Sequence, residues 1–355
     1  MTTSSSPATK SAYAACHDDA AYVDFMVGLR RLALGEIKNA AVAASEAELA
    51  RRGEPIRDVL DLRRLLDPVP VIALRNRVVR SVQEKTWRRV ADTVHGRASE
   101  LLAEIAEAER RGPGSVHCDP QLTYPEYYTV EDIHLQPGSY YGDPLAGAIT
   151  EYGGNVFYAG LNLDGQVKQA SVGHVPLPAD GVVTRVLDLA CSIGQSTTAF
   201  KQRFPDARVT GIDIAAPMVR YAHRRAIKLG VDVEFRQESA AALSFPDAAF
   251  DLVYCNILFH EVPRDVAERV VTEAHRVLRP GGVFVVVDFA NRPAHGPMDW
   301  GDYHRNVDCI YNGEPFASAF VYSDFTTLLE SVFPVVDPDH HLDPGGIRLM
   351  RVCTR

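Results

Sequence analysis

The clearest chemical pattern in the sequence is an acid followed by a turn of small residues. Asp188 lies in the apolar run 185–189, and Ala190, Ser192 and Gly194 alternate through the segment that follows. Small side chains let a ligand approach the backbone closely, and the first turn of a helix offers unpaired N–H groups. This pattern predicts a binding site for a small ligand where a strand passes into a helix.

A second acid stands in the equivalent place after the next apolar run. Asp213 follows the run 208–212, 25 residues after Asp188, and Ile214 comes next. A carboxylate at the end of the second strand can accept hydrogen bonds from both hydroxyls of a ribose. The alternative is that Asp213 only caps the following helix. Its spacing from the first acid favours the ribose role.

Further motifs follow in a fixed order. They are Arg236-Gln237-Glu238-Ser239, Phe245-Pro246-Asp247-Ala248-Ala249-Phe250-Asp251, Asn256-Ile257-Leu258-Phe259-His260-Glu261 and Arg276-Val277-Leu278-Arg279-Pro280-Gly281-Gly282-Val283. Together with the turn after Asp188, they resemble the motifs of class I S-adenosylmethionine (SAM)-dependent methyltransferases with a type 11 or type 25 domain. Many members of that family act on small molecules.

The resemblance implies the cofactor and its site. The usual first motif of the family is acid-x-Gly-x-Gly-x-Gly, and this sequence has Ala190 and Ser192 in place of the first two glycines. Glu238 stands where the family usually has Asp. The resemblance implies SAM as the cofactor, bound by Asp188, Ala190, Ser192, Gly194, Asp213, Ile214, Glu238, Ser239 and Asn256.

NAD is the main alternative cofactor for a strand, turn and helix of this kind. A dinucleotide site needs Gly-x-Gly-x-x-Gly after the first strand, and this turn has only one of those glycines. Asp188 would also repel a pyrophosphate, whereas it can hold the amino group of SAM. The sequence therefore favours SAM over NAD.

His260 is the expected catalytic base. An acceptor oxygen or nitrogen that carries a proton needs a base as well as alignment with the methyl group. His260 follows the fourth strand and resembles the histidine that small-molecule O-methyltransferases place there; the alternative is a structural histidine that caps the next helix. In the insertion-like stretch 291–320, His304 is a second catalytic candidate and Glu314 a candidate for substrate contact, unless both are structural.

No metal site is expected. His340 and His341 are neighbours, and neighbouring residues of a strand point to opposite faces. The cysteines are widely scattered and form no Cys-x-x-Cys pair, which favours neither a disulfide framework nor a zinc cluster and fits a reducing cytoplasm. They are Cys16, Cys118, Cys191, Cys255, Cys309 and Cys353.

These residues need a sheet to position them. Apolar runs at 185–189, 208–212, 231–237, 250–255 and 282–289 alternate with helical stretches at 196–204, 216–229 and 264–278. Such alternation predicts an α/β fold with a mostly parallel sheet, which binds ligands along the carboxyl edge of its strands. The resemblance implies a Rossmann-like, seven-stranded mixed sheet with an antiparallel last strand. The runs 333–336 and 347–353 are the expected final strand pair.

The sequence divides into four predicted regions. Residues 1–12 are expected to be a disordered tail, 13–112 a mainly helical N-terminal domain, 113–180 an aromatic linking and lid segment, and 181–355 the SAM-binding domain. The segment 113–180 holds seven of the fourteen tyrosines, which suit either a lid over a ligand or packing between domains. The helical domain carries an apolar stripe, which consists of Leu74, Val78, Val82, Val90, Val94, Leu101 and Ile105. We therefore expect these helices to form a homodimer and to cover the substrate.

Composition limits the partners. The formal net charge of −9 argues against nucleic acid as the main partner, because binding to phosphate backbones depends on clustered Lys and Arg. A membrane span needs about 18 consecutive apolar residues, and we find no such stretch in the sequence. The N-terminus lacks the pattern of a signal peptide. We expect a cytoplasmic protein with a small-molecule substrate.

The expected activity is methylation of a small molecule in specialised metabolism, with oxygen favoured over nitrogen or carbon because of His260. Two other functions stay open. One is a SAM-fold enzyme with different chemistry, such as cyclisation or decarboxylation. The other is a non-catalytic binding module, which the replaced glycines at Ala190 and Ser192 would suit.

Overall fold

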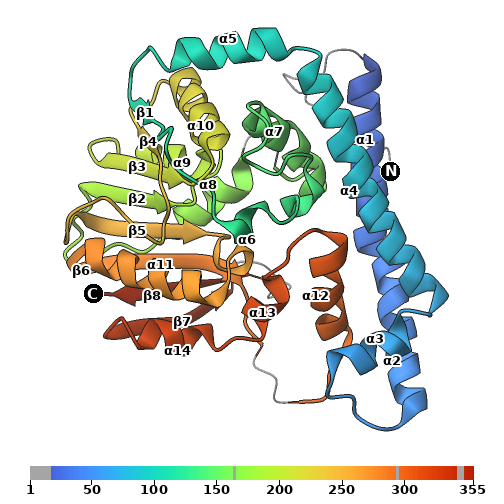
Figure 1. Ribbon diagram of the computed structural model, residues 1–355. Coiled ribbons are helices and arrows are strands. Elements are labelled where there is room, and N and C mark those ends of the chain that lie inside the picture. Colours follow the sequence, from blue (N-terminus) through green and yellow to red (C-terminus); the bar gives the residue numbers. More distant parts are fainter. Residues whose placement is uncertain (1–16, 163–164, 293–295, 342–347) are drawn as a thin grey trace, which may run out of the picture.

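The computed structural model describes residues 17–162, 165–292, 296–341 and 348–355. Figure 1 shows a sheet domain beside a layer of long helices, with shorter helices between the two. The predicted tail 1–12 lies outside the described residues. Within the described part of the chain, no helix is both long and apolar enough to cross a membrane.

The N-terminal helices form the outer layer. They are α1 (His17–Leu32), the π-helical turn η1 (Ala33–Ile37), α2 (Lys38–Arg52), α3 (Val59–Leu66), α4 (Pro70–His95) and α5 (Ala98–Ala108). Gly53 ends α2 in the left-handed conformation, and the Asp58 side chain caps α3 by accepting hydrogen bonds from two backbone N–H groups. Pro70 stands in the first turn of α4, where its missing N–H costs nothing.

The predicted apolar stripe lies mostly inside the molecule. Val82, Val90 and Val94 are buried in one cluster with residues of α1 and α7 (Ala146–Phe157). Leu74 is the exception, because the first turns of α4 instead bury Arg75 and Asn76 against α12 (Trp300–Tyr311). Most of the stripe is therefore core, and it leaves little free surface there for the proposed dimer.

The sheet has eight strands among the described residues, where seven were predicted. Its order is β1-β4-β3-β2-β5-β6-β8-β7, and β8 runs antiparallel to both of its neighbours as expected. The extra strand β1 pairs parallel with β4 at one edge. The strands are β1 (Ser115–His117), β2 (Arg185–Leu189), β3 (Arg208–Asp213), β4 (Glu234–Gln237), β5 (Phe250–Asn256), β6 (Leu278–Phe289), β7 (Val335–His341) and β8 (Arg348–Thr354).

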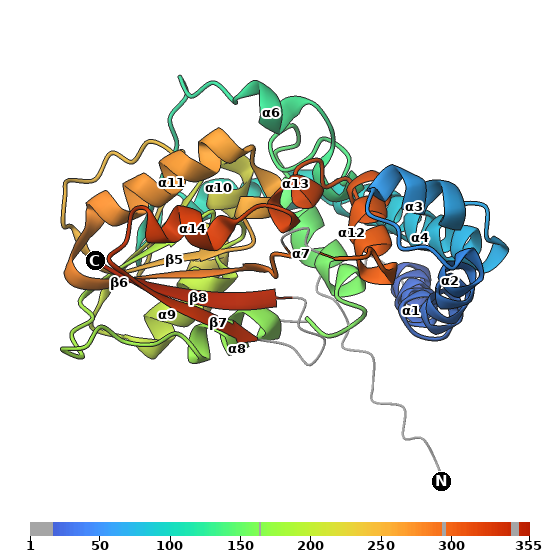
Figure 2. The same ribbon diagram turned by 90° about the horizontal axis from the view of Figure 1, so that it is seen from below.

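Helices cover both faces of this sheet (Figure 2). One face packs on α8 (Gln166–Gly173) and α9 (Gln195–Arg203), and the other on α11 (Arg264–Val277) and α14 (Phe325–Glu330). The helix α10 (Ala216–Leu229) packs on β3 and β4 and also contacts α5 and α7. Strands buried on both faces explain the nearly continuous apolar runs of the sequence.

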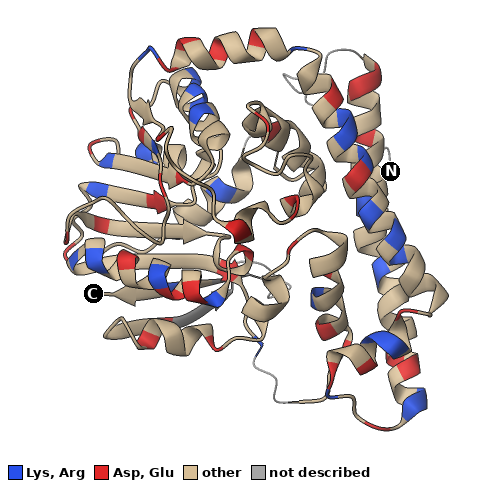
Figure 3. Cartoon of the chain, in the orientation of Figure 1, with Lys and Arg blue, Asp and Glu red and all other residues tan. Residues whose placement is uncertain are grey.

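One helix from the C-terminal half belongs to the N-terminal layer. Trp300, Tyr303 and Val307 of α12 share a buried cluster with residues of α2, α3 and α4. The short helix α13 (Ala317–Val321) follows and contacts the turn η3 (Phe259–Glu261). Figure 3 shows that basic and acidic residues are interspersed along the elements of both parts of the molecule.

Candidate functional site

A cavity of about 190 Å³ lies at the carboxyl edge of the sheet, where β2, β3 and β5 end. One wall comes from the turns after these strands and includes Ala190, Ser192, Asp213, Ile214, Glu238, Ser239 and Asn256. The opposite wall comes from the aromatic segment and from α4; it includes Trp87, Tyr127, Tyr128, His134, Tyr140, Phe157 and Tyr158. Most of the residues predicted to hold the cofactor thus meet in one cavity.

The turn after β2 keeps the backbone of a glycine-rich loop. Ala190, Ser192 and Gly194 all have positive φ angles, of 53°, 52° and 73°. Non-glycine residues adopt this left-handed region only at a cost of about 1–2 kcal/mol each, so the surrounding structure imposes the shape. The replacement of two glycines therefore leaves the loop conformation intact.

Asp188 supports this turn from behind rather than lining the cavity. Its Oδ2 accepts hydrogen bonds from Ser196 Oγ at 2.7 Å and Thr197 Oγ1 at 2.6 Å, which fix the first turn of α9 to the end of β2. Burial raises the pKa of Asp188 to about 6, although the two hydroxyl groups oppose this rise. Gly194 likewise lies behind the wall, where an added Cβ would come within 2.9 Å of Ala222 and the Phe235 ring.

Asp213 stands on the cavity wall as the sequence predicts. Its Oδ2 accepts from the Ser192 N–H and its Oδ1 from the Ala215 N–H, both at 2.9 Å. Burial raises the pKa of this carboxyl to about 6, opposed by the same two N–H groups. Each carboxylate oxygen has two lone pairs, so both oxygens can still accept a hydroxyl from a ligand in the cavity.

The remaining predicted residues line the far part of this wall. The Glu238 carboxylate turns to the backbone N–H of Ser244, so its side chain shapes the loop that it begins. Asn256 accepts a hydrogen bond from Lys168 Nζ and donates one to Tyr254 Oη at 2.6 Å. The next residue, Ile257, has a φ of 63°, a strained conformation for a β-branched residue that is concentrated at functional sites.

The cavity is lined by more acids than bases. Among the described residues around it, the acids are Glu151, Asp213, Glu238 and Glu261, and the side chain with a fixed positive charge is Lys168. A phosphate-rich ligand would meet repulsion here, whereas a ligand with positive charge is favoured. SAM carries a sulfonium and an ammonium group, whereas NAD carries a pyrophosphate. The charges of the residues around the cavity therefore fit SAM better than NAD.

His260 lies behind the cavity wall, not on it. Its side chain is fully buried, and its Nδ1 lies 2.6 Å from Asp288 Oδ1. Burial lowers the pKa of His260, but the Asp288 carboxylate outweighs this and raises it to about 9. The neighbouring Glu261 does line the cavity, so it reaches a bound acceptor more directly than His260 does.

His304 is not brought to the cavity. It lies on α12, where it contacts Arg75 Nη2 and Asp308 Oδ2, each at 2.9 Å. Glu314, in contrast, lies next to His134, with Oε1 at 3.1 Å from His134 Nε2. No role for His134 could be predicted from the sequence, because its segment has no recognisable motif and only the tertiary structure brings it to this place.

Comparison with known proteins identifies the domain that these features define. Residues 186–282 match the methyltransferase domain family. The chain is 40% identical over 121 residues to a demethylmenaquinone methyltransferase of Thermus thermophilus, an overlap of 34% of this chain and 53% of that protein. It is 37% identical over 129 residues to the 27-O-demethylrifamycin SV methyltransferase of Amycolatopsis mediterranei, an overlap of 36% of this chain and 45% of the relative.

Among solved structures, a SAM-dependent methyltransferase from Aquifex aeolicus superposes with a TM-score of 0.40 and 19% identity, over 59% of this chain and 97% of that one. The chain spans about half the length of the curated relatives it matches. It carries a class I methyltransferase domain, and the cofactor of that domain is SAM.

Proposed function

We propose that the protein transfers a methyl group from SAM to an oxygen of a small-molecule acceptor. The observation that carries this proposal is the cavity itself. The residues of the methyltransferase motifs form one of its walls, and the aromatic segment forms the other. One cavity therefore offers a place for the cofactor and a place for an apolar or aromatic acceptor.

The cofactor end of the cavity is the wall of strand turns. Asp213 would accept hydrogen bonds from the ribose hydroxyls, and the left-handed turn at Ala190 and Ser192 lets the ligand approach the backbone. Glu238 and Ser239 would lie near the adenine. When bound, SAM supplies an electrophilic methyl group on a sulfonium.

The acceptor end is the aromatic wall. Tyr127, Tyr140 and Tyr158 present rings with polar tips to the cavity, which suits an acceptor with both apolar and hydrogen-bonding groups. We assign residues 113–180 as the lid over the acceptor and 13–112 as its support. Trp87 of the support reaches the cavity and donates to the His134 carbonyl at 2.8 Å. These contacts help to exclude water from the reaction.

The residues that follow β5 would remove the proton from the acceptor. Glu261 lines the cavity and lies 3.8 Å from His260 Nε2. In this proposal Glu261 takes the proton, and His260 behind it is a positioning residue. An acceptor hydroxyl needs such a group, whereas a neutral amine already has a free lone pair and needs it less, and this favours oxygen over nitrogen.

Calorimetric titration with SAM, S-adenosylhomocysteine and NAD tests the cofactor site. We expect micromolar binding of both adenosyl ligands and none of NAD. Asp213→Asn keeps the size of the side chain but removes its charge and one acceptor, so SAM affinity should fall by at least about 10-fold. Asp206→Asn, at an exposed acid between α9 and β3, is the matched control and should bind SAM normally.

Acceptor screening by release of S-adenosylhomocysteine then tests the activity. Release with a hydroxyl-bearing acceptor would support the proposal. SAM binding without release from any acceptor that binds would point to SAM-fold chemistry other than methyl transfer. Absence of adenosyl binding in protein free of co-purified ligand would favour a non-catalytic binding module.

A further inference from the structure

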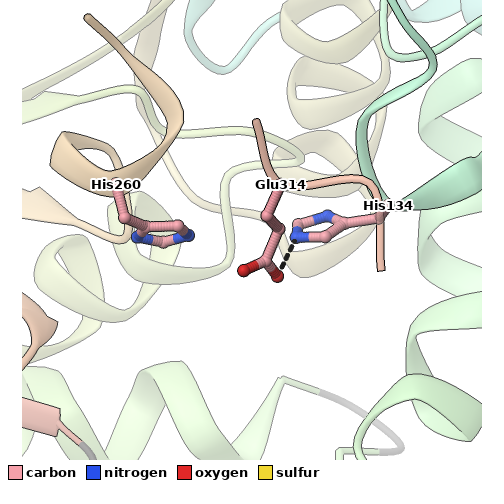
Figure 4. A group of neighbouring side chains, drawn as sticks. All are labelled: His134, His260 and Glu314. Carbon is pink, nitrogen blue, oxygen red and sulfur yellow. Dashed lines mark hydrogen bonds and ion pairs between the residues drawn. The ribbon is translucent and has the colours of Figure 1, made fainter. Parts of the chain in front are cut away.

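Three side chains of metal-ligand type meet beside the cavity. They are His134 in the turn η2 (Ile133–Leu135), His260 in η3 and Glu314 between α12 and α13. One ligand atom of each lies within 4.8 Å of the other two. Figure 4 shows the Glu314 carboxylate between the two imidazole rings, with one oxygen toward each histidine.

Each histidine has one ring nitrogen fixed by a neighbour, which leaves the other facing the centre of the group. His260 Nδ1 lies 2.6 Å from Asp288 Oδ1, and His134 Nδ1 contacts the Tyr140 hydroxyl. Metal-binding histidines in proteins are held in the same way, with the second nitrogen donating to a carboxylate or another oxygen.

His260 Nε2 has no hydrogen-bond partner among the described residues. Its side chain is 0% exposed, and the Glu314 side chain only 4%. An unpaired polar atom at this depth costs about 1–3 kcal/mol, and it points toward a carboxylate that it does not contact. A bound ion would satisfy this nitrogen.

The backbone around His134 is held in a costly conformation. Its φ is 54°, and three interactions maintain it: its N–H donates to the Gly313 carbonyl at 3.0 Å, and its own carbonyl accepts from Trp87 Nε1 at 2.8 Å and Gln83 Nε2 at 3.0 Å. Glu314 follows Gly313 directly, so the same contact fixes both His134 and Glu314. Strain that several contacts maintain is typical of a preorganised site.

We propose that His134 Nε2, His260 Nε2 and the Glu314 carboxylate bind a divalent first-row transition-metal ion. Two imidazoles and a carboxylate suit zinc, iron or cobalt better than magnesium or calcium. Ligand atoms on such an ion lie roughly 3.4 Å apart at metal–ligand distances of about 2.1 Å. Shifts of about 1 Å by these side chains would bring them to that spacing.

The site deepens the proposed function and rests on it for its role in catalysis. His134 and Glu261 both line the cavity, and Glu261 Oε1 lies 3.7 Å from His134 Nε2 and 3.8 Å from His260 Nε2. An acceptor hydroxyl bound to the ion would become more acidic. Its O–H bond would break, with the electron pair kept by the oxygen on the metal and the proton taken by Glu261. The acceptor class is then a molecule with an ionisable oxygen, such as an enol or a phenol.

Titration of the chelator-treated protein with Co²⁺ tests the site directly. Cobalt bound by nitrogen and oxygen ligands absorbs visible light, so it reports both stoichiometry and coordination. We expect one Co²⁺ per chain, displaced by Zn²⁺ and not by Mg²⁺. Glu314→Gln keeps the shape of the side chain and should weaken Co²⁺ binding by more than about 100-fold, and Tyr140→Phe by about 10–100-fold.

The control separates this site from surface binding. His95 forms an exposed pair with Asp143 at 2.6 Å, and His95→Ala should leave Co²⁺ binding and its spectrum unchanged. Circular dichroism and the thermal midpoint establish that each variant is folded. No stoichiometric Co²⁺ binding by the folded wild-type protein would overturn the proposal, and so would binding that persists unchanged in Glu314→Gln.

The outcome is independent of the cofactor test. Co²⁺ binding without SAM binding would retain the metal site and remove the methyltransferase proposal. If chelator-treated protein takes up no metal but binds SAM and releases S-adenosylhomocysteine with an acceptor, the methyltransferase proposal would stand and the metal site would be removed.

Discussion

At the scale of single residues, the turn after β2 shows how a glycine pattern can change while its backbone stays. Ala190 has a φ of 53°, so Ala190→Gly should relieve strain and raise the free energy of unfolding by about 0.5–1 kcal/mol. Gly194→Ala should lower it, because its Cβ would come within 2.9 Å of Ala222 and Phe235 at a φ of 73°. Denaturant titration of the two variants measures both effects.

The control is an alanine in ordinary helix. Ala73 is exposed in α4, and Ala73→Gly should lower the free energy of unfolding by about 1 kcal/mol. A loss of similar size for Ala190→Gly would show that its positive φ is not a source of strain.

The positions that could be predicted from the sequence are those of residues that belong to a motif or that follow directly after a predicted strand. The position of Asp213 on the cavity wall could be predicted because an acid at the end of a parallel strand lies at the carboxyl edge of the sheet, where ligands bind. His134 and Glu314 are 180 residues apart, and no spacing rule connects them. Glu314 was considered only for substrate contact, and His134 received no role, because their proximity comes from packing of α12 and α13 against the sheet domain.

At the scale of elements, periodicity placed the strands that bear the motifs but missed β1. The prediction for 208–212 differs from β3 by one residue, and the run 231–237 contains β4. In contrast, β1 has only three residues, Ser115–His117, and is partly exposed. In so short a segment, no alternation of apolar and polar residues can be recognised. The segment is a strand because it pairs with the edge of β4.

Gly153 allows α7 to pack closely against Trp87 of α4. A Cβ on Gly153 would overlap the ring of Trp87, which is buried and fixed by its hydrogen bond to the His134 carbonyl. Gly153→Ala should therefore lower the free energy of unfolding by about 1–3 kcal/mol. It should also weaken Co²⁺ binding, because Trp87 helps to hold His134.

Gly154 provides the matched control on the same helix. A Cβ there meets nothing within 4 Å, so Gly154→Ala should be neutral or stabilise the helix by up to about 1 kcal/mol. Equal losses of stability for the two variants, measured by denaturant titration, would contradict this account of the packing.

At the scale of the whole molecule, the N-terminal helices and the sheet domain share a core through α12. Tyr303 is fully buried there; its hydroxyl donates to Asp67 Oδ1 and accepts from Asn76 Nδ2, each at 2.8 Å. Tyr303 lies in the C-terminal half of the chain and both partners in the N-terminal helices. The two parts should therefore unfold together, as one cooperative unit.

Tyr303→Phe tests this coupling. It leaves the buried Asn76 amide without its acceptor, which should lower the free energy of unfolding by about 1–3 kcal/mol. Scanning calorimetry should show a single transition that moves to lower temperature as a whole, with SAM stabilising helices and sheet alike. Tyr311→Phe is the control, because the Tyr311 hydroxyl makes no hydrogen bond among the described residues. Two separate transitions, with only one shifted by Tyr303→Phe, would mean that the helical layer is an independent domain and that its contact with the cavity does not depend on α12.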